Sequence, residues 1–148
     1  MRSAALLLLA LTIAGCGPKR DPLEDYGTRM VNLPGGQQVR AEVMINPQDL
    51  ARGMMFRDSL APDRGMLFLH EQAGEYPYWM YQCRIPLDMI WMNSERRVVE
   101  IAASAQPCRT EPGQCPTYGG HYRAQYVLEL AGGMAAKYGI KEGDTLGF

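Results

Sequence analysis

The chain has 148 residues and a formal net charge of −1, with 47% hydrophobic and 21% charged residues. This length suits one domain with its own hydrophobic core and is too short for two full-sized domains. A charge near zero provides no overall attraction to a nucleic-acid backbone, so we expect no nucleic-acid partner.

The first sixteen residues resemble a bacterial lipoprotein signal. Arg2 gives a positive start, residues 4–14 are uncharged and largely apolar, and Gly15 precedes Cys16. The apolar run is well short of the roughly 20 residues of a transmembrane helix, which favours a cleaved signal peptide at 1–15. The resemblance implies that the Cys16 thiol receives a lipid, whose acyl chains would anchor the protein to the membrane. The alternative is ordinary secretion with a cysteine at this position by chance.

Residues 17–27 mix proline, glycine and charges of both signs without an apolar period, as in a solvated tether. We therefore divide the chain into a signal peptide at 1–15, a lipidated tether at 16–27 and a single β-rich domain at 28–148. Gly17 stands where retention in an inner membrane would usually require aspartate. We expect an exported lipoprotein of the bacterial cell envelope, anchored in the outer membrane and facing the periplasm.

The domain is expected to begin with a hairpin of strands at 28–33 and 38–45, in which apolar side chains alternate with polar ones. The apolar face of the second strand is Val39, Ala41, Val43 and Ile45. Asn46 and Pro47 suit the start of a helix that runs toward Met55. Further strands are expected at 65–69, 78–82, 87–92, 97–103, 124–130 and 144–148, with a second helix at 134–138. Seven to eight short strands predict a mainly β (α+β) fold, a single-domain β sandwich or open barrel with two short helices.

Three cysteines lie in the domain, and export would place them in an oxidising compartment. A proline–glycine turn separates Cys108 from Cys115, so a disulfide between these two is the preferred pairing. Cys83 would remain as a buried thiol or, alternatively, a reactive one. A zinc site with His121 is disfavoured, because six residues between the paired cysteines exceed the usual structural-zinc spacing. A thioredoxin-like function is excluded, because the chain has no Cys-x-x-Cys.

Six short blocks of sequence follow one another in a recognisable order. They are Arg52–Arg57, Gly65–Phe68, Trp79–Met80, Pro86–Asp88, Tyr126–Leu130 and Gly143–Asp144. Together they resemble the DUF192 family, named for a domain of unknown function. The resemblance implies a mainly β single domain of prokaryotes, frequently exported, with no established activity or cofactor. One departure is at position 81, where the family commonly has lysine and this chain has Tyr81, so an expected cationic contact is missing.

Four charged residues are candidates for a site. Arg52 and Arg57 lie five residues apart around a predicted helix end, and their planar guanidinium groups could converge on a carboxylate or phosphate. Alternatively, each arginine pairs with Asp88 or Glu129, because both acids lie in otherwise apolar strands. The two carboxyl groups could instead act as a general acid and base, which requires a cleft and opposed pKa values.

Aromatic and sulfur side chains suggest two further interpretations. The densest aromatic stretch, Tyr76–Tyr81, includes Trp79 and could stack on a sugar ring or a peptide if it is exposed. The nine methionines that follow the expected signal peptide could bind copper(I), although filling the core is their ordinary use. Met89 and Met92 would lie on opposite faces of a strand, which disfavours a copper site between them.

We therefore expect a non-catalytic envelope module that binds a small anionic or carbohydrate ligand, or another envelope protein. The expected ligand-binding residues are Arg52, Arg57, Trp79, Asp88 and Glu129. The first alternative is a hydrolase or transferase that uses Asp88 or Glu129 as a base, which a carboxyl group of strongly raised pKa in a cleft would favour. The second is soft-metal (copper) handling. No motif indicates a resident metal or cofactor.

Overall fold

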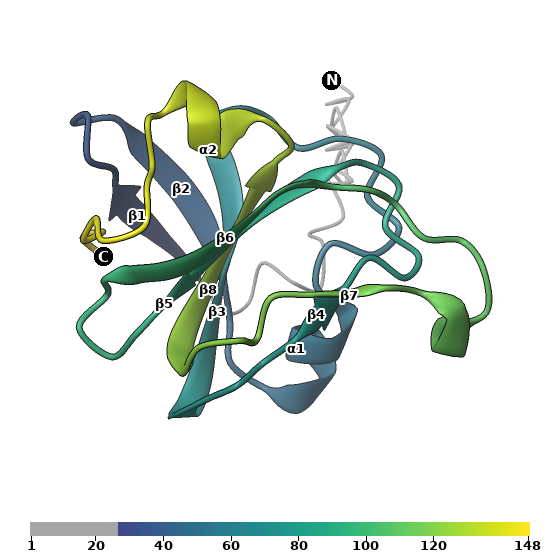
Figure 1. The fold of residues 1–148 in the computed structure, drawn as a ribbon. Coiled ribbons are helices and arrows are strands. Elements are labelled where there is room, and N and C mark those ends of the chain that lie inside the picture. The colour runs from purple at the N-terminus through teal and green to yellow at the C-terminus, as the bar shows by residue number, and fades with distance from the viewer. Residues whose placement is uncertain (1–26) are drawn as a thin grey trace, which may run out of the picture.

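The computed structural model describes residues 27–148 (Figure 1). Within this range the chain forms eight strands, two short α-helices and one 3₁₀ turn. In chain order they are β1 (Thr28–Asn32), β2 (Gln38–Met44), α1 (Pro47–Arg52), β3 (Arg64–Gly74), β4 (Tyr78–Trp79), β5 (Leu87–Met92), β6 (Val98–Ala105), η2 (Pro112–Gln114), β7 (Thr117–Tyr118), β8 (Ala124–Ala131) and α2 (Met134–Lys137). The described part contains no helix long and apolar enough to cross a bilayer. The expected signal peptide and the expected lipidation site, Cys16, lie outside the described residues.

Six strands form one mixed sheet in the order β1-β2-β3-β8-β5-β6, and β4 pairs with β7 in a small second sheet. Strands β2 and β3 are parallel because α1 carries the chain between them, whereas the neighbouring pairs are antiparallel. The large sheet does not close into a barrel, although the C-terminal segment forms isolated bridges near both edges, at Asn32–Gly147 and Arg97–Thr145. The predicted α+β, sandwich-like fold with two short helices is confirmed.

The large sheet separates two hydrophobic cores. Alternation along β5 directs Met89 and Trp91 into one core and Ile90 and Met92 into the other. Side chains of α1 and the β4–β7 sheet pack on the first core, while α2 and the C-terminal segment pack on the second (Figure 1). Met89 and Met92 therefore lie on opposite faces, as the strand period predicts.

The helix α1 begins as expected and ends earlier. The Asn46 side chain caps it by accepting a 2.9 Å hydrogen bond from the Asp49 N–H group, and Pro47 occupies the first turn. The helix stops at Arg52 and does not continue toward Met55, because Gly53 turns the chain at φ 43°. This glycine brings the following residues back toward the sheet.

Several strand boundaries also differ from the prediction. The strand β3 extends to Gly74, because it resumes pairing with β8 after an irregularity. The strand β4 stops at Trp79, and Gln82 has a positive φ of 56° that no extended strand accommodates. At the end of β2 the alternation breaks, so that Met44 is buried whereas Ile45 is 56% exposed. The expected strand at 144–148 is reduced to the isolated bridges.

The predicted disulfide between Cys108 and Cys115 is confirmed, with 5.8 Å between the two Cα atoms. The 3₁₀ turn η2 lies between the cysteines, where the proline–glycine turn was expected. Cys108 also joins the disulfide loop to the segment after β4. Its N–H donates to the Met80 carbonyl, and its carbonyl accepts from the Gln82 N–H, both at 2.9 Å. The disulfide loop therefore supports the chain segment that forms one wall of the pocket described next.

Candidate functional site

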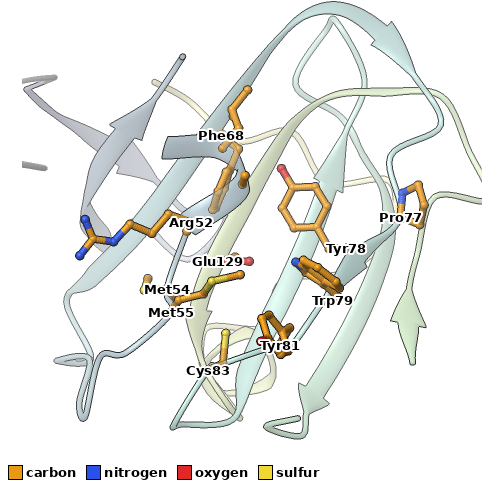
Figure 2. A pocket seen from close by; sticks show the side chains of 13 residues that line it. Arg52, Met54, Met55, Phe68, Pro77, Tyr78, Trp79, Tyr81, Cys83 and Glu129 are labelled. Atoms are coloured by element: carbon orange, nitrogen blue, oxygen red, sulfur yellow. The ribbon is translucent and has the colours of Figure 1, made fainter. Parts of the chain in front are cut away.

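A pocket of about 230 Å³ lies between α1 and β4, above β3 and β8 of the large sheet (Figure 2). Its wall is mainly apolar and aromatic, with side chains from both helix and strands. The side chains include Leu50, Met54, Phe68, Tyr78, Trp79 and Tyr81. Sites for drug-sized ligands typically have roughly 300–1,000 Å³, so this pocket suits a smaller molecule.

Glu129 on β8 is the acidic residue of the pocket wall (Figure 2). It is only 4% exposed, and its Oε2 atom has no hydrogen-bond partner in the described part of the chain. Burial raises the pKa of the Glu129 carboxyl group from 4.5 to about 8, against the opposing effect of the Arg57 charge. The carboxyl group of Glu129 is therefore mainly protonated at neutral pH.

The aromatic residues of the pocket divide into a fixed wall and an exposed rim. Tyr78 packs edge-on against Phe68, with 5.2 Å between the ring centroids, and its hydroxyl lies 3.1 Å from His70 Nε2. Burial, followed by the charge of Glu129, raises the pKa of Tyr78 well above 10. Trp79 is 39% exposed, and its ring centroid lies 5.2 Å from that of Tyr81. The rim of Trp79 and Tyr81 can thus contact a ligand, and the packed rings of Tyr78 and Phe68 form the wall behind it.

Cys83 is a buried, unpaired thiol in the same pocket wall. Burial, with a smaller effect of Glu129, raises the pKa of the thiol to about 12. Because the thiolate is the nucleophilic form, this environment favours an inert side chain over a reactive one.

The two arginines have different surroundings. Arg57 forms a bidentate ion pair with Glu42, in which each terminal nitrogen of the guanidinium group lies 2.6 Å from a carboxylate oxygen. The predicted partner of Arg57 was Asp88 or Glu129, and Glu42 was not predicted. Arg52 is exposed at the end of α1, and Figure 2 shows its guanidinium group extending away from Glu129. An anion site built from both guanidinium groups is therefore disfavoured.

Asp88 lies outside the pocket and stabilises the fold. Its Oδ1 atom accepts hydrogen bonds from the N–H groups of Ser104 and Gly133 at 2.7 and 3.0 Å. Its Oδ2 atom accepts one from the Ala135 N–H at 2.7 Å, so the buried carboxyl group joins β5, β6 and the start of α2. The interpretation of Asp88 as the partner of an arginine is wrong, because backbone N–H groups occupy both oxygens.

The register of β5 and β8 also separates the two candidate acids. Asp88 pairs with Leu130, the neighbour of Glu129 on β8. Adjacent residues of a strand point to opposite faces, so Asp88 faces α2 whereas Glu129 faces the pocket. The prediction of Asp88 and Glu129 as an acid–base pair is therefore wrong. Of the five expected ligand-binding residues, the structure places Arg52, Trp79 and Glu129 along the pocket.

Gly53 is a site residue that sequence reasoning missed. A Cβ atom at this position would lie 3.1 Å from Cζ of Phe68 and 3.9 Å from Oε2 of Glu129. A glycine here therefore keeps the pocket open above the carboxyl group. The only signal in the sequence was its place in the first of the six blocks, between Arg52 and Met54. In residues 27–148, no three His, Cys, Asp or Glu side chains are grouped so that they could hold a metal ion.

The solved structures that are similar to this chain include two from bacteria. One, from Sinorhizobium meliloti 1021, is described as a proposed transcription regulator. It is 29% identical, with a TM-score of 0.74 over 82% of this chain and 94% of that chain. The other is a protein of unknown function from Novosphingobium aromaticivorans DSM 12444. It is 30% identical, with a TM-score of 0.73 over 89% of this chain and 100% of that chain.

No curated protein matches the chain. The model of the DUF192 family, described as an uncharacterized ACR, matches residues 30–148. This range includes the pocket wall, the ion pair of Arg57 and the disulfide. The chain belongs to the DUF192 family.

Proposed function

We propose that this protein is a cell-envelope lipoprotein whose single domain, 28–148, is a non-catalytic module that binds a small ligand in the Glu129 pocket. The observation that carries the binding role is the buried Oε2 atom of Glu129, which lacks a hydrogen-bond partner among residues 27–148. A polar group left unpaired in an apolar site costs roughly 1–3 kcal/mol. A ligand that pairs with Oε2 removes this cost, which favours the bound state.

The shape and chemistry of the pocket favour a compact ligand with an apolar or aromatic body and one polar group. The volume of about 230 Å³ excludes an oligosaccharide, and a single sugar would leave most of its hydroxyl groups unpaired against Met54, Phe68 and Tyr78. An anion would meet the carboxyl group of Glu129, while both terminal nitrogens of Arg57 are already hydrogen-bonded to Glu42. The exposed indole of Trp79 provides the surface on which the ligand body would stack.

Two independent features support the envelope address. The first is the signal-like sequence that ends at Cys16, the residue that would carry the lipid and anchor the protein in the outer membrane, facing the periplasm. The second is the Cys108–Cys115 disulfide, because structural disulfides persist in oxidising compartments. Mass spectrometry of the native protein should find a lipid-modified Cys16 as the first residue. An intact Met1 with an unmodified Cys16 would overturn the proposal.

Ligand binding is tested by a thermal-shift screen of the purified protein against small envelope metabolites. A ligand at a hundredfold its Kd should add about 2.7 kcal/mol to the free energy of unfolding. The Glu129→Gln variant should lose this effect, whereas Glu71→Gln, a change on the exposed part of β3, should retain it. Stabilisation of the wild type and Glu129→Gln to the same extent would place the ligand elsewhere.

A second candidate function is acid–base catalysis by Glu129 in a hydrolase or transferase. The observation that favours it is the pKa of about 8 within a pocket, because general acids and bases work best near the operating pH. Turnover of simple aryl esters, glycosides or phosphates that disappears in Glu129→Gln and persists in Glu71→Gln would support this function. Equal turnover in both variants would exclude Glu129 as the catalytic group.

A further inference from the structure

The Oε2 atom of Glu129 is directed to the pocket and has no hydrogen-bond partner in the described chain. The oxygen is buried, and the absence of a side chain at Gly53 leaves space next to it, since a Cβ atom there would lie only 3.9 Å from it. Met54, Met55, Tyr78 and Trp79 line the same pocket as Glu129 (Figure 2). The ligand charge that the pocket favours therefore depends mainly on the interaction between the ligand and the carboxyl group of Glu129.

The charged and titratable groups around Glu129 would compensate the charge of an ionised carboxylate only in part, so a cationic ligand could pair with it. Arg57 acts on Glu129 through its charge, but both of its terminal nitrogens are bound to Glu42. Arg52 extends away from the pocket. Tyr78 and Cys83 both have raised pKa values and are neutral at pH 7. If the Glu129 carboxyl group ionised, its charge would therefore be only partly compensated by the protein.

Three ligand chemistries can be compared at this site. An anion would be repelled by an ionised Glu129 and by the negative faces of the aromatic rings, although a protonated Glu129 could donate one charge-assisted hydrogen bond to it. A neutral ligand would also gain one ordinary hydrogen bond. A cation would gain a charge-assisted hydrogen bond, which is roughly twice as strong, and attraction to the faces of the Tyr78 and Trp79 rings.

We infer that the ligand of the Glu129 pocket is a small organic cation, with an ammonium group on an apolar or aromatic body. This inference rests on the proposed binding function and adds the charge of the ligand. The ammonium group pairs with the Glu129 carboxylate, and the body fills the space between Met54, Phe68 and Trp79. Binding converts the protonated carboxyl group into a carboxylate, so its proton passes to solvent while the ammonium group keeps its own protons.

This proton release has a measurable consequence. Below the pKa of Glu129, about one proton should leave for each cation bound, and affinity should rise by up to about tenfold per pH unit. The increase should level off near pH 8. A neutral ligand that accepts a hydrogen bond from the protonated Glu129 should bind with nearly constant affinity below pH 8 and more weakly above it, because it needs the proton to stay.

The experiment uses three probes of similar size and different charge, namely 2-phenylethylammonium, 2-phenylethanol and phenylacetate. Their affinities for the purified protein are measured by calorimetry at pH 6, 7 and 8, in buffers of different ionisation enthalpy to count released protons. Tryptophan fluorescence reports on the location, since the chain has only Trp79 and Trp91, and Trp91 is buried. Glu129→Gln tests the carboxyl group, and Glu71→Gln is the matched exposed control.

The ammonium probe should bind about tenfold more tightly than the alcohol at pH 8, with proton release at pH 6 and 7. Glu129→Gln should abolish both the preference and the proton release, and Glu71→Gln should keep them. If the alcohol or phenylacetate binds as tightly as the ammonium, the pocket remains a binding site and the cationic class is overturned. If none of the three binds, the cationic class fails and the small-ligand function also loses its support.

Discussion

Replacing Glu129 by glutamine should make the stability of the ligand-free protein much less dependent on pH. The pKa of Glu129 is raised from 4.5 to about 8, so between these values the folded protein keeps a proton that the unfolded chain has lost. The stabilising contribution of this proton is therefore complete below pH 4.5 and is lost as the pH rises through 8. Glutamine has nearly the same shape and cannot titrate, so the variant lacks this dependence.

The size of the effect follows from the same two pKa values. Between pH 4.5 and pH 8, each pH unit lowers the free energy of unfolding of the wild type by about 1.4 kcal/mol. The total over this pH range is roughly 5 kcal/mol. This is a large share of the 5–15 kcal/mol, roughly, that stabilises a typical domain. The stability of Glu129→Gln relative to the wild type should thus increase steadily from pH 5 to pH 8.

Urea unfolding at pH 5, 6, 7, 8 and 9, followed by circular dichroism, measures this difference. Glu71→Gln, which changes an exposed carboxyl group on β3, should run parallel to the wild type. Parallel curves for Glu129→Gln and the wild type would refute the reasoning, because they would mean that Glu129 is already ionised and solvated in the folded protein.

Other substitutions test the parts of the fold that support the pocket. Asp88→Asn should lower the free energy of unfolding by roughly 3 kcal/mol in urea titrations, because an amide NH₂ group would face backbone N–H donors; a change below about 0.5 kcal/mol would contradict its structural role. Replacing both Cys108 and Cys115 by serine should cost roughly 2.5 kcal/mol in the same assay through loop entropy, and an unchanged midpoint would contradict this. Gly53→Ala should strain the backbone, which has a positive φ at this residue, and its methyl group should narrow the pocket and abolish the ligand-induced thermal shift. A retained shift would show that the ligand does not occupy the space next to Glu129. Cys83 should react with iodoacetamide only after unfolding, as mass spectrometry would show, and rapid labelling of the folded protein would contradict its raised pKa.

Much of the fold could be predicted from the sequence because its signals are local. The hairpin of β1 and β2 is encoded by alternation and a proline–glycine turn, and the start of α1 by Asn46 and Pro47. The Cys108–Cys115 pairing follows from closeness in sequence. The parallel pairing of β2 with β3 was not predicted, because it depends on where the chain crosses after Gly53.

The candidate site was predicted only in part because it depends on strand register. Sequence reasoning selected both Asp88 and Glu129 as acids in apolar strands, but only the pairing of Asp88 with Leu130 shows that they face opposite sides. The partner of Arg57 was missed for a similar reason, since Glu42 was assigned to the polar face of a hairpin. The cavity itself depends on the absence of a side chain at Gly53, and a sequence carries no direct signal of empty space.

The proposed binding function depends on a protonated Glu129 whose Oε2 atom has no hydrogen-bond partner among residues 27–148. Carboxyl-carbon NMR of the protein labelled with ¹³C-glutamate, titrated from pH 4 to pH 9, tests it most directly. We predict that one glutamate resonance, absent in Glu129→Gln, titrates near pH 8 and shifts to the ionised position when 2-phenylethylammonium is added. A Glu129 resonance that titrates near 4.5 in the free protein would contradict the account.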